Sequence, residues 1–339
     1  MSDPNQITPV VVISGFLGSG KTTLLTKWIE YYKGMNQQVA VIMNELGDVN
    51  LDGLMINESI PMAEMLSGCI CCTIRGDLGT TIMNLVEQEH PNVILIESTG
   101  AANPLELIDG VTEASLYIRI HLQLVVIIVD GPHLLELAEK GIGKTYKLMK
   151  EQIRCADVVL LNKLDRVDST ELSDLQKVVR DINTTATLIE TIQCDVDPTL
   201  LDPDRLNVKR QLAHKVDHNH YPSQASHTHH SHDHVMVYTH YFDGPVDSVR
   251  FEQFISELPH SVYRAKGVLR FTDTPQESRF LFQYAYRESD YLRITPKKDT
   301  PDVLVLIGEH IPKVEIKSLL DNLQNEMECQ SPDCGDFGS

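Results

Sequence analysis

The sequence predicts two domains, an α/β domain with a mostly parallel sheet and then a smaller α+β domain. In the first two hundred residues, short apolar runs rich in β-branched side chains alternate with longer amphipathic stretches. Each run holds five to seven residues, a length that favours strands over buried helices. The length of 339 residues also suits about two domains, at roughly 150 residues per domain.

Apolar runs of this kind are typical of parallel strands that helices cover on both faces. The predicted strands of the first domain are Pro9–Ser14, Val39–Asn44, Val93–Glu97, Leu124–Asp130, Val158–Asn162 and Thr187–Gln193. The helical patterns between them include Lys21–Lys33, Gly76–Glu89, Tyr146–Cys155 and Glu171–Ile182.

A histidine-rich segment separates the two domains. Nine of the 14 histidines fall between His214 and His240, and so few apolar residues cannot form a core. The predicted domains are therefore 1–205, a linker at 206–234, a second domain at 235–326 and a flexible tail at 327–339. In the second domain we expect strands at Val235–Tyr241, Gly267–Phe271, Leu281–Tyr286 and Val303–Ile307, and helices at Val249–Leu258 and Pro312–Leu323.

Charge and composition exclude several classes of function. With 29 basic and 48 acidic residues the net charge is −19, which disfavours binding to nucleic acid and to anionic membranes. No apolar run approaches the ~20 residues of a membrane span, and no secretion signal is visible at the start. Seven cysteines, three of them within four positions, argue against a disulfide framework, so we expect a cytoplasmic protein.

The first predicted strand leads directly into the sequence GFLGSGKTT, which has the spacing of a phosphate-binding P-loop. Glycines such as Gly15 and Gly20 let backbone N–H groups turn toward phosphates, and Lys21 supplies a positive charge to the β- and γ-phosphates. The Thr22 hydroxyl can join a Mg²⁺ shell. A chance glycine-rich turn is the alternative, but an apolar strand and an amphipathic helix flank this one.

Two further motifs end predicted strands. In Asn162-Lys163-Leu164-Asp165, a carboxylate can accept two hydrogen bonds from guanine, which predicts GTP rather than ATP. In Glu97-Ser98-Thr99-Gly100, the acid can sense Mg²⁺ and the glycine the γ-phosphate, although a plain turn is the alternative. No Gln follows Gly100 to orient the attacking water, so we expect slow hydrolysis.

Three thiols, Cys69, Cys71 and Cys72, lie within four residues and form a candidate site for Zn²⁺ or a neighbouring metal. A redox pair is the alternative. Three thiols leave a tetrahedral position open to water, to an incoming ligand or to a carboxylate such as Glu45 or Asp48, in the predicted switch loop. The linker histidines could also chelate metal, while for Cys155 and Cys194 we prefer simple core packing.

Together these motifs resemble the CobW-type metallochaperone GTPases, of the SIMIBI class of P-loop proteins. The resemblance covers nearly the whole chain, from about Thr8 to Leu323. It rests on GFLGSGKTT, NELGDVNLDG, SGCICC, ESTGAANP, NKLD, RAKGVLRF and VLVLIG. The resemblance implies a GTP-dependent metal insertase or chaperone, a GTP hydrolase, whose C-terminal domain recognises client proteins.

The resemblance also implies roles for individual residues. Lys21 and Glu97 would be catalytic, Thr22 and Glu97 would hold or sense Mg²⁺, and Cys69, Cys71 and Cys72 would bind the delivered metal. The residues that would bind GTP are Gly15, Gly18, Ser19, Gly20, Lys21, Thr22, Thr23, Gly100, Asn162, Lys163 and Asp165.

The leading hypothesis is a zinc-handling GTPase that delivers the ion to a client protein under control of the GTP/GDP state. One alternative is a metal store or sensor in which GTP binding is uncoupled from delivery. Another is a chaperone of cobalt, nickel or iron for a cofactor or metalloenzyme. A nucleotide-dependent homodimer is left open.

Overall fold

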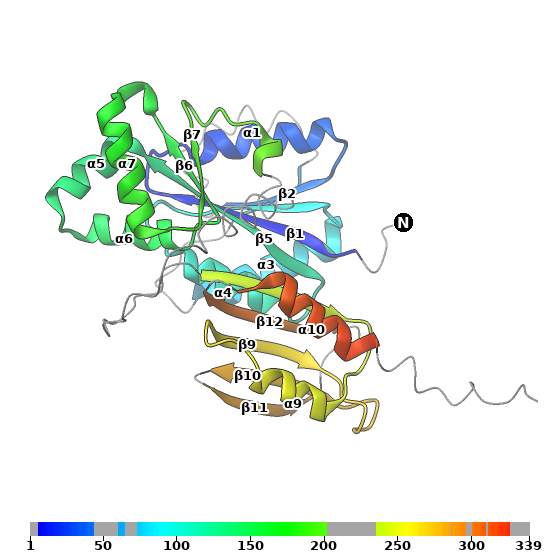
Figure 1. Cartoon of the computed structure of the whole chain (residues 1–339). Helices are drawn as coiled ribbons and strands as arrows, with labels where there is room; N and C mark the ends of the chain where they lie inside the picture. The colour runs from blue at the N-terminus through cyan, green and yellow to red at the C-terminus, as the bar shows by residue number, and fades with distance from the viewer. Residues whose placement is uncertain are drawn as a thin grey trace, which may run out of the picture. The chain divides into compact units, whose positions relative to one another are not determined.

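The computed structural model describes residues 6–43, 60–64, 73–201, 235–285, 287–295, 300–309 and 311–325. The chain divides into two compact units. The first takes its residues from 1–114 and 120–235, and the second from 115–119 and 236–339. The prediction of an α/β domain with a parallel sheet and a smaller α+β domain is confirmed (Figure 1).

The first unit contains a parallel sheet of seven strands in the order β3-β2-β4-β1-β5-β6-β7. Its strands are β1 (Thr8–Gly15), β2 (Val39–Met43), β3 (Met62–Glu64), β4 (Val93–Glu97), β5 (Ile120–Asp130), β6 (Val158–Asn162) and β7 (Thr187–Glu190). Its helices are α1 (Lys21–Gly34), α3 (Thr73–Glu89), α4 (Pro104–Ala114), α5 (Gly131–Lys140), α6 (Lys144–Arg154) and α7 (Ser169–Ile182).

Helices cover both faces of this sheet, with α1 on one face and α3 and α4 on the other (Figure 1). In β1, Val11 and Ile13 belong to the same hydrophobic cluster as Trp28 of α1. Val10 and Val12, which point to the opposite face, are fully buried as well. Burial on both faces is the physical reason why the sequence shows continuous apolar runs instead of alternation.

Each strand predicted in the first unit has a counterpart, and the differences are local. The predicted strand Thr187–Gln193 is too long, because β7 ends at Glu190 and the φ angles of Gln193 and Cys194 are 55° and 51°. Residues in that left-handed region cannot continue a strand. The strand β3 and the helices α4 and α5 were not predicted from the sequence.

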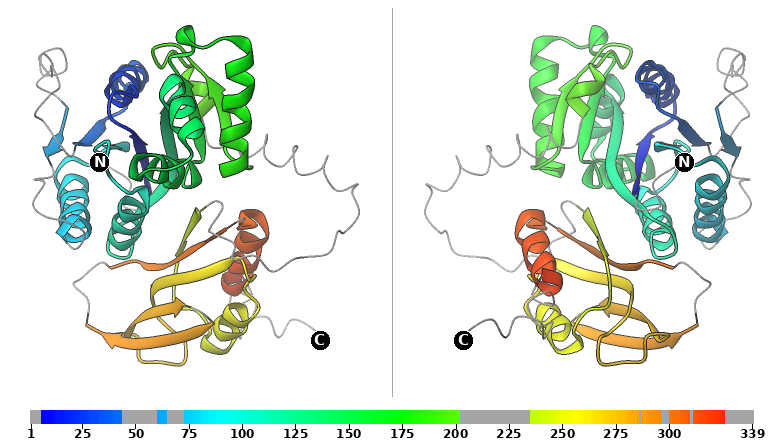
Figure 2. Two further views of the ribbon diagram at one scale, coloured as in Figure 1. Left: turned by 90° about the vertical axis from the view of Figure 1, so that its left-hand side faces the viewer. Right: turned by 90° about the vertical axis from the view of Figure 1, so that its right-hand side faces the viewer.

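The second unit contains a sheet of five strands in the order β11-β10-β9-β12-β8. Its strands are β8 (Val235–Phe242), β9 (Val262–Leu269), β10 (Arg279–Ala285), β11 (Glu288–Ile294) and β12 (Asp302–Glu309). The helices α9 (Ser248–Ser256) and α10 (Lys313–Asn325) pack on one face, around a core that includes Phe251, Phe282 and Leu320 (Figure 2). The pairings of β9 with β10 and β12, and of β10 with β11, are antiparallel.

Two predictions for this unit were wrong in detail. The strand predicted at Gly267–Phe271 begins five residues earlier, at Val262. Its first half was not predicted because charged residues alternate there with apolar ones. The edge strand β11 was missed because its sequence, ESDYLRI, is largely exposed and polar. The predicted linker at 206–234 and tail at 327–339 lie outside the described residues. In the parts that are described, no helix has the length and apolar character that crossing a membrane requires.

Candidate functional site

The P-loop turns between the end of β1 at Gly15 and the start of α1 at Lys21. Gly20, which precedes the helix, has a φ of 116°. A Cβ atom at this position would lie 2.7 Å from both Asn162 Nδ2 and Cys194 Sγ. Only glycine therefore fits, for conformational and steric reasons together. Gly15 and Gly18 also have positive φ angles, and Thr23 lies exposed in the first turn of α1.

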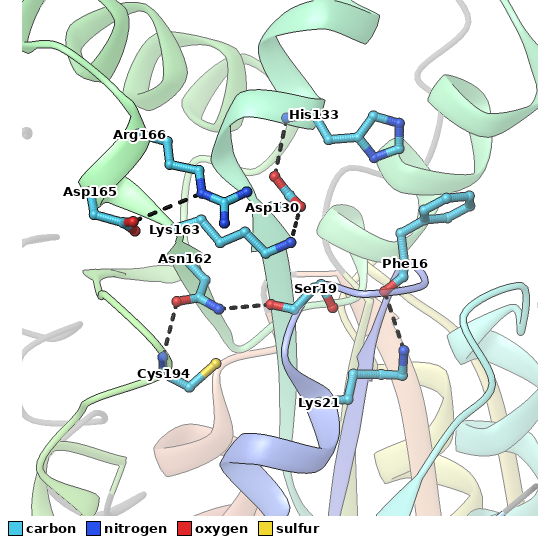
Figure 3. Close-up of polar contacts among 10 residues, drawn as sticks. All are labelled: Phe16, Ser19, Lys21, Asp130, His133, Asn162, Lys163, Asp165, Arg166 and Cys194. Atoms are coloured by element: carbon cyan, nitrogen blue, oxygen red, sulfur yellow. Dashed lines mark hydrogen bonds and ion pairs between the residues drawn. The ribbon is translucent and has the colours of Figure 1, made fainter. Parts of the chain in front are cut away.

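The N-terminus of α1 is built to receive an anion. No side chain caps it and its first turn carries no acidic residue, so its first N–H groups are available to a ligand. Lys21 is 92% buried, and its Nζ donates a hydrogen bond to the carbonyl oxygen of Phe16, at 3.2 Å (Figure 3). The ammonium is thus held over the loop that would surround the phosphates.

Thr22 and Glu97 meet beside the P-loop, although they are 75 positions apart in sequence. Because β1 and β4 are neighbours, with Ile13 paired to Glu97, the carboxyl group ends next to the first turn of α1. Thr22 Oγ1 donates a hydrogen bond to Glu97 Oε1 at 2.9 Å. Burial raises the pKa of Glu97, and this outweighs the lowering by the Thr22 hydrogen bond and the Lys21 charge.

One buried oxygen atom at this place, Glu97 Oε2, has no hydrogen-bond partner among the described residues. Buried polar atoms are nearly always satisfied, so unsatisfied ones indicate a missing ligand. Hydroxyl and carboxylate oxygens are the ligands that Mg²⁺ prefers. The residues present therefore fit a magnesium ion that accompanies a nucleotide.

Gly100 lies directly against the P-loop. A Cβ atom at Gly100 would be 2.6 Å from the backbone nitrogen of Leu17 and 2.9 Å from its Cα. Leu17 itself is 79% exposed at the tip of the loop. The backbone that follows β4 thus reaches the tip of the P-loop without any side chain between them.

Asn162, at the end of β6, joins three segments of the chain. Its Nδ2 donates to Ser19 O at 2.7 Å, and its Oδ1 accepts from Cys194 N at 3.0 Å (Figure 3). The same oxygen also accepts from Thr191 Oγ1 at 3.2 Å. Only 2% of the residue is exposed. Its amide connects the P-loop to the segment after β7, and the role of Asn162 in reading guanine stays a prediction.

Lys163 and Asp165 lie on the exposed side of the same motif. Lys163 has a φ of 64°, and its Nζ forms a 2.6 Å ion pair with Asp130, the last residue of β5 (Figure 3). Asp130 also accepts a hydrogen bond from His133 N at the start of α5. The Asp165 side chain is 48% exposed, with Arg166 as a distant partner at 3.9 Å. Its carboxylate is therefore accessible to a base.

A cavity of about 710 Å³ opens beside Leu164 of this motif, a size that suits a small-molecule ligand. Lys27, which is part of the cavity wall, is bonded to the segment after β7: its Nζ lies 3.2 Å from Gln193 O and 3.1 Å from Asp195 Oδ1. The lining residues are Lys27, Leu164, Glu190, Thr191, Ile192, Gln193 and Asp195. The sequence patterns did not indicate that the segment 191–195 lines a site, and its only signal was that it follows a strand whose end shares the edge of the P-loop.

The predicted metal ligands Cys69, Cys71, Cys72, Glu45 and Asp48 lie outside the described residues. Across the residues that the structure does describe, no three His, Cys, Asp or Glu side chains gather in a way that could hold a metal ion. The remaining two thiols of the first unit, Cys155 and Cys194, are free and buried, as the core-packing interpretation expects.

Comparison with known proteins extends this picture to both units. A family model described as "CobW/HypB/UreG, nucleotide-binding domain" matches residues 9–190. A second, described as "Cobalamin synthesis protein cobW C-terminal domain", matches residues 236–324.

The similar proteins include the zinc chaperone CobW of a Sinorhizobium species, 28% identical over 81% of this chain and 84% of that protein. The zinc chaperone YeiR of Escherichia coli K12 is 32% identical over 68% of this chain and 65% of its own length. The zinc-regulated GTPase metalloprotein activator 1 of Dictyostelium discoideum is 32% identical, but the match spans only 45% of that protein. Among solved structures, the Zn(II)-bound YjiA GTPase of Escherichia coli aligns with 94% of this chain at 22% identity and a TM-score of 0.46.

Proposed function

Because the chain belongs to the CobW/HypB/UreG family of P-loop GTPases, we propose that it is a GTP-hydrolysing metallochaperone that binds zinc and delivers it to a client protein. The ion is its cargo, and the nucleotide state controls how tightly the ion is held. The observation that carries the proposal is the place of the thiol motif in the chain, between two elements of the nucleotide-binding unit.

The phosphates of GTP would lie at the N-terminus of α1. Backbone N–H groups of the P-loop and the Lys21 ammonium would neutralise the charge that develops on the γ-phosphate. Thr22 and Glu97 would hold Mg²⁺, which when bound would neutralise negative charge on the phosphates. The Gly100 N–H would contact the γ-phosphate alone, so that it distinguishes GTP from GDP.

The base would lie at the end of β6. Asp165 is the carboxylate that would accept from guanine, and the ion pair with Asp130 fixes the side chain of Lys163 in the same motif. The cavity beside Leu164 would receive the nucleoside, with the segment from Thr191 to Asp195 as its other wall.

The place of the thiol motif in the sequence supports a coupling between metal and nucleotide. Cys69 follows Glu64, the last residue of β3, by five positions in the sequence. Because β3, β2 and β4 are parallel neighbours, β3 ends at the same edge as Glu97. The last residue of the motif, Cys72, precedes α3 directly. A change at the γ-phosphate would therefore act on a segment that both β3 and α3 anchor.

To test this proposal, the zinc affinity of protein purified free of metal is measured by competition with a chelating dye. It is measured once with Mg²⁺ and a non-hydrolysable GTP analogue, and once with Mg²⁺ and GDP. We expect at least a ten-fold difference, which corresponds to about 1.4 kcal/mol. By linkage, zinc must change the nucleotide affinity by the same factor.

The matched control replaces both Cys71 and Cys72 by Ser. This variant should bind GTP as the wild type does and lose the coupling between zinc and nucleotide. If the coupling survives the double replacement, the thiols are not the site.

A metal store or sensor is the second candidate, favoured by the histidines between His214 and His240. It predicts that most bound zinc disappears when 217–234 is deleted and that nucleotide has no effect on the rest. The chaperone keeps one tight site after the same deletion. The proposal has two further parts. Co-purification can identify the client protein, and light scattering can detect a homodimer that forms with GTP.

A further inference from the structure

We propose that Gln152 is a positioning residue that holds the Gly100 backbone in place for the γ-phosphate, an inference that rests on the proposed GTPase function. Gln152 lies on α6, 52 positions after Gly100, and it belongs to none of the nucleotide motifs that the sequence patterns identify. Its role would be to make the nucleotide site selective for GTP over GDP.

The contacts of Gln152 are made with the segment that follows Glu97. Its Nε2 donates hydrogen bonds to Gly100 O and to Ala102 O, both at 3.3 Å. A side-chain amide nitrogen carries two hydrogens, so these two carbonyls use both donors. Carbonyl oxygens on both sides also determine the orientation of the amide, because its own oxygen would be repelled there. The residue is 1% exposed, which protects both bonds from water.

The helix that carries Gln152 is firmly anchored at its C-terminal end. Asn183, fully buried, donates through Nδ2 to Ile153 O at 2.8 Å and to Ala156 O at 3.1 Å. Its Oδ1 accepts from the backbone nitrogens of Thr185 and Ala186. Because the turn next to Gln152 is bonded on both sides in this way, the amide approaches Gly100 from a rigid support.

On its other side, the P-loop restricts the movement of Gly100, because the Gly100 Cα hydrogen faces the backbone of Leu17 at close range. The turn is closed by a hydrogen bond from Ala102 N to Thr99 O at 3.1 Å. Gly100 is thus held between the P-loop and α6. Without the amide of Gln152, the segment from Gly100 to Ala102 would gain conformations that GTP binding must remove, whereas GDP does not use this segment.

The test is Gln152→Met, which keeps the length of the side chain and removes both donors. We expect the affinity for a non-hydrolysable GTP analogue with Mg²⁺ to fall about ten-fold, the affinity for GDP to stay within about two-fold, and kcat to fall. Gln152→Asn, which keeps the amide but shortens its reach, should show the same loss of selectivity. Gln253→Met on α9 is the matched control, because the Gln253 side-chain amide donates to the Glu257 carboxylate on the surface of the second unit.

The outcomes separate the inference from the proposed function. If the wild type distinguishes the GTP analogue from GDP and both Gln152 variants distinguish them equally well, the positioning role is overturned. An equal loss for both nucleotides also overturns it, because that result is the mark of general destabilisation. If the wild type binds no guanine nucleotide, the proposed function itself fails. Should Gln152→Met not fold, Gln152→Asn decides alone.

Discussion

Replacing Asn162 by Ala should destabilise the nucleotide-binding unit even when no nucleotide is present. The side chain makes three hydrogen bonds in a buried place, to Ser19 O, Cys194 N and Thr191 Oγ1. The net value of one such bond is about 1 kcal/mol, and buried partners left alone cost at least as much. The loss in unfolding free energy is therefore expected to be about 3 kcal/mol.

The assay is thermal unfolding of the nucleotide-free protein, followed at the transition that GDP shifts in the wild type. In a unit of this size 1 kcal/mol moves Tm by about 2–4 °C, so Asn162→Ala should lower it by roughly 6–12 °C. The affinity for GDP should fall as well, because the P-loop loses its connection to the segment after β7.

Asn92→Ala is the matched control, since Asn92 accepts one hydrogen bond from Gln38 N near the surface. Water replaces a surface partner at little cost, so this variant should lose less than about 1 kcal/mol. If Asn162→Ala lowers Tm no more than Asn92→Ala does, the three bonds do not connect these segments and the reasoning is refuted.

Three other substitutions or treatments give independent checks. Gly100→Ala places a methyl group 2.6 Å from Leu17 N, so the P-loop must move and calorimetry should find GDP affinity reduced by roughly ten-fold or more; unchanged affinity would contradict the close approach. Because burial raises the pKa of Glu97, folding disfavours its ionised form, and Glu97→Gln should raise Tm of the nucleotide-free protein at pH 7. This gain should disappear below the ordinary value of 4.5, where the carboxyl is protonated in both states, and a gain that grows as the pH falls would be the wrong sign. Burial also raises the pKa of Cys194 to about 11 and that of Cys155 to about 12, so alkylation at pH 8 should spare both thiols until the protein unfolds, as peptide mapping can show.

The order of strands and helices in the first unit could be predicted because its physical cause is local. A strand buried on both faces needs an apolar run such as Val158–Asn162, and a helix on the sheet needs one apolar side. Where these causes weaken, prediction fails. The edge strand β11 exposes most of its residues, and β7 ends where Gln193 and Cys194 turn into the left-handed region.

The P-loop and the Asn-Lys-Leu-Asp motif were likewise visible in the sequence, since a P-loop depends on glycines, a Lys and a Thr at fixed spacing. Their partners were not. That Glu97 meets Thr22, or that Asp130 holds Lys163, depends on which strands are neighbours in the sheet.

By itself, the sequence determined the class of fold, the P-loop, the Asn-Lys-Leu-Asp motif and the three clustered thiols, because each is a pattern of neighbouring residues. Only the tertiary structure decided that Asn162 joins three segments, that Gly100 lies against Leu17, and that Gln152 reaches Gly100 from a separate helix. The residues that these contacts join lie between about 50 and about 140 positions apart in the sequence. Single-residue patterns carry no signal for them, because they arise when strands that are distant in the chain pair side by side and bring their ends together.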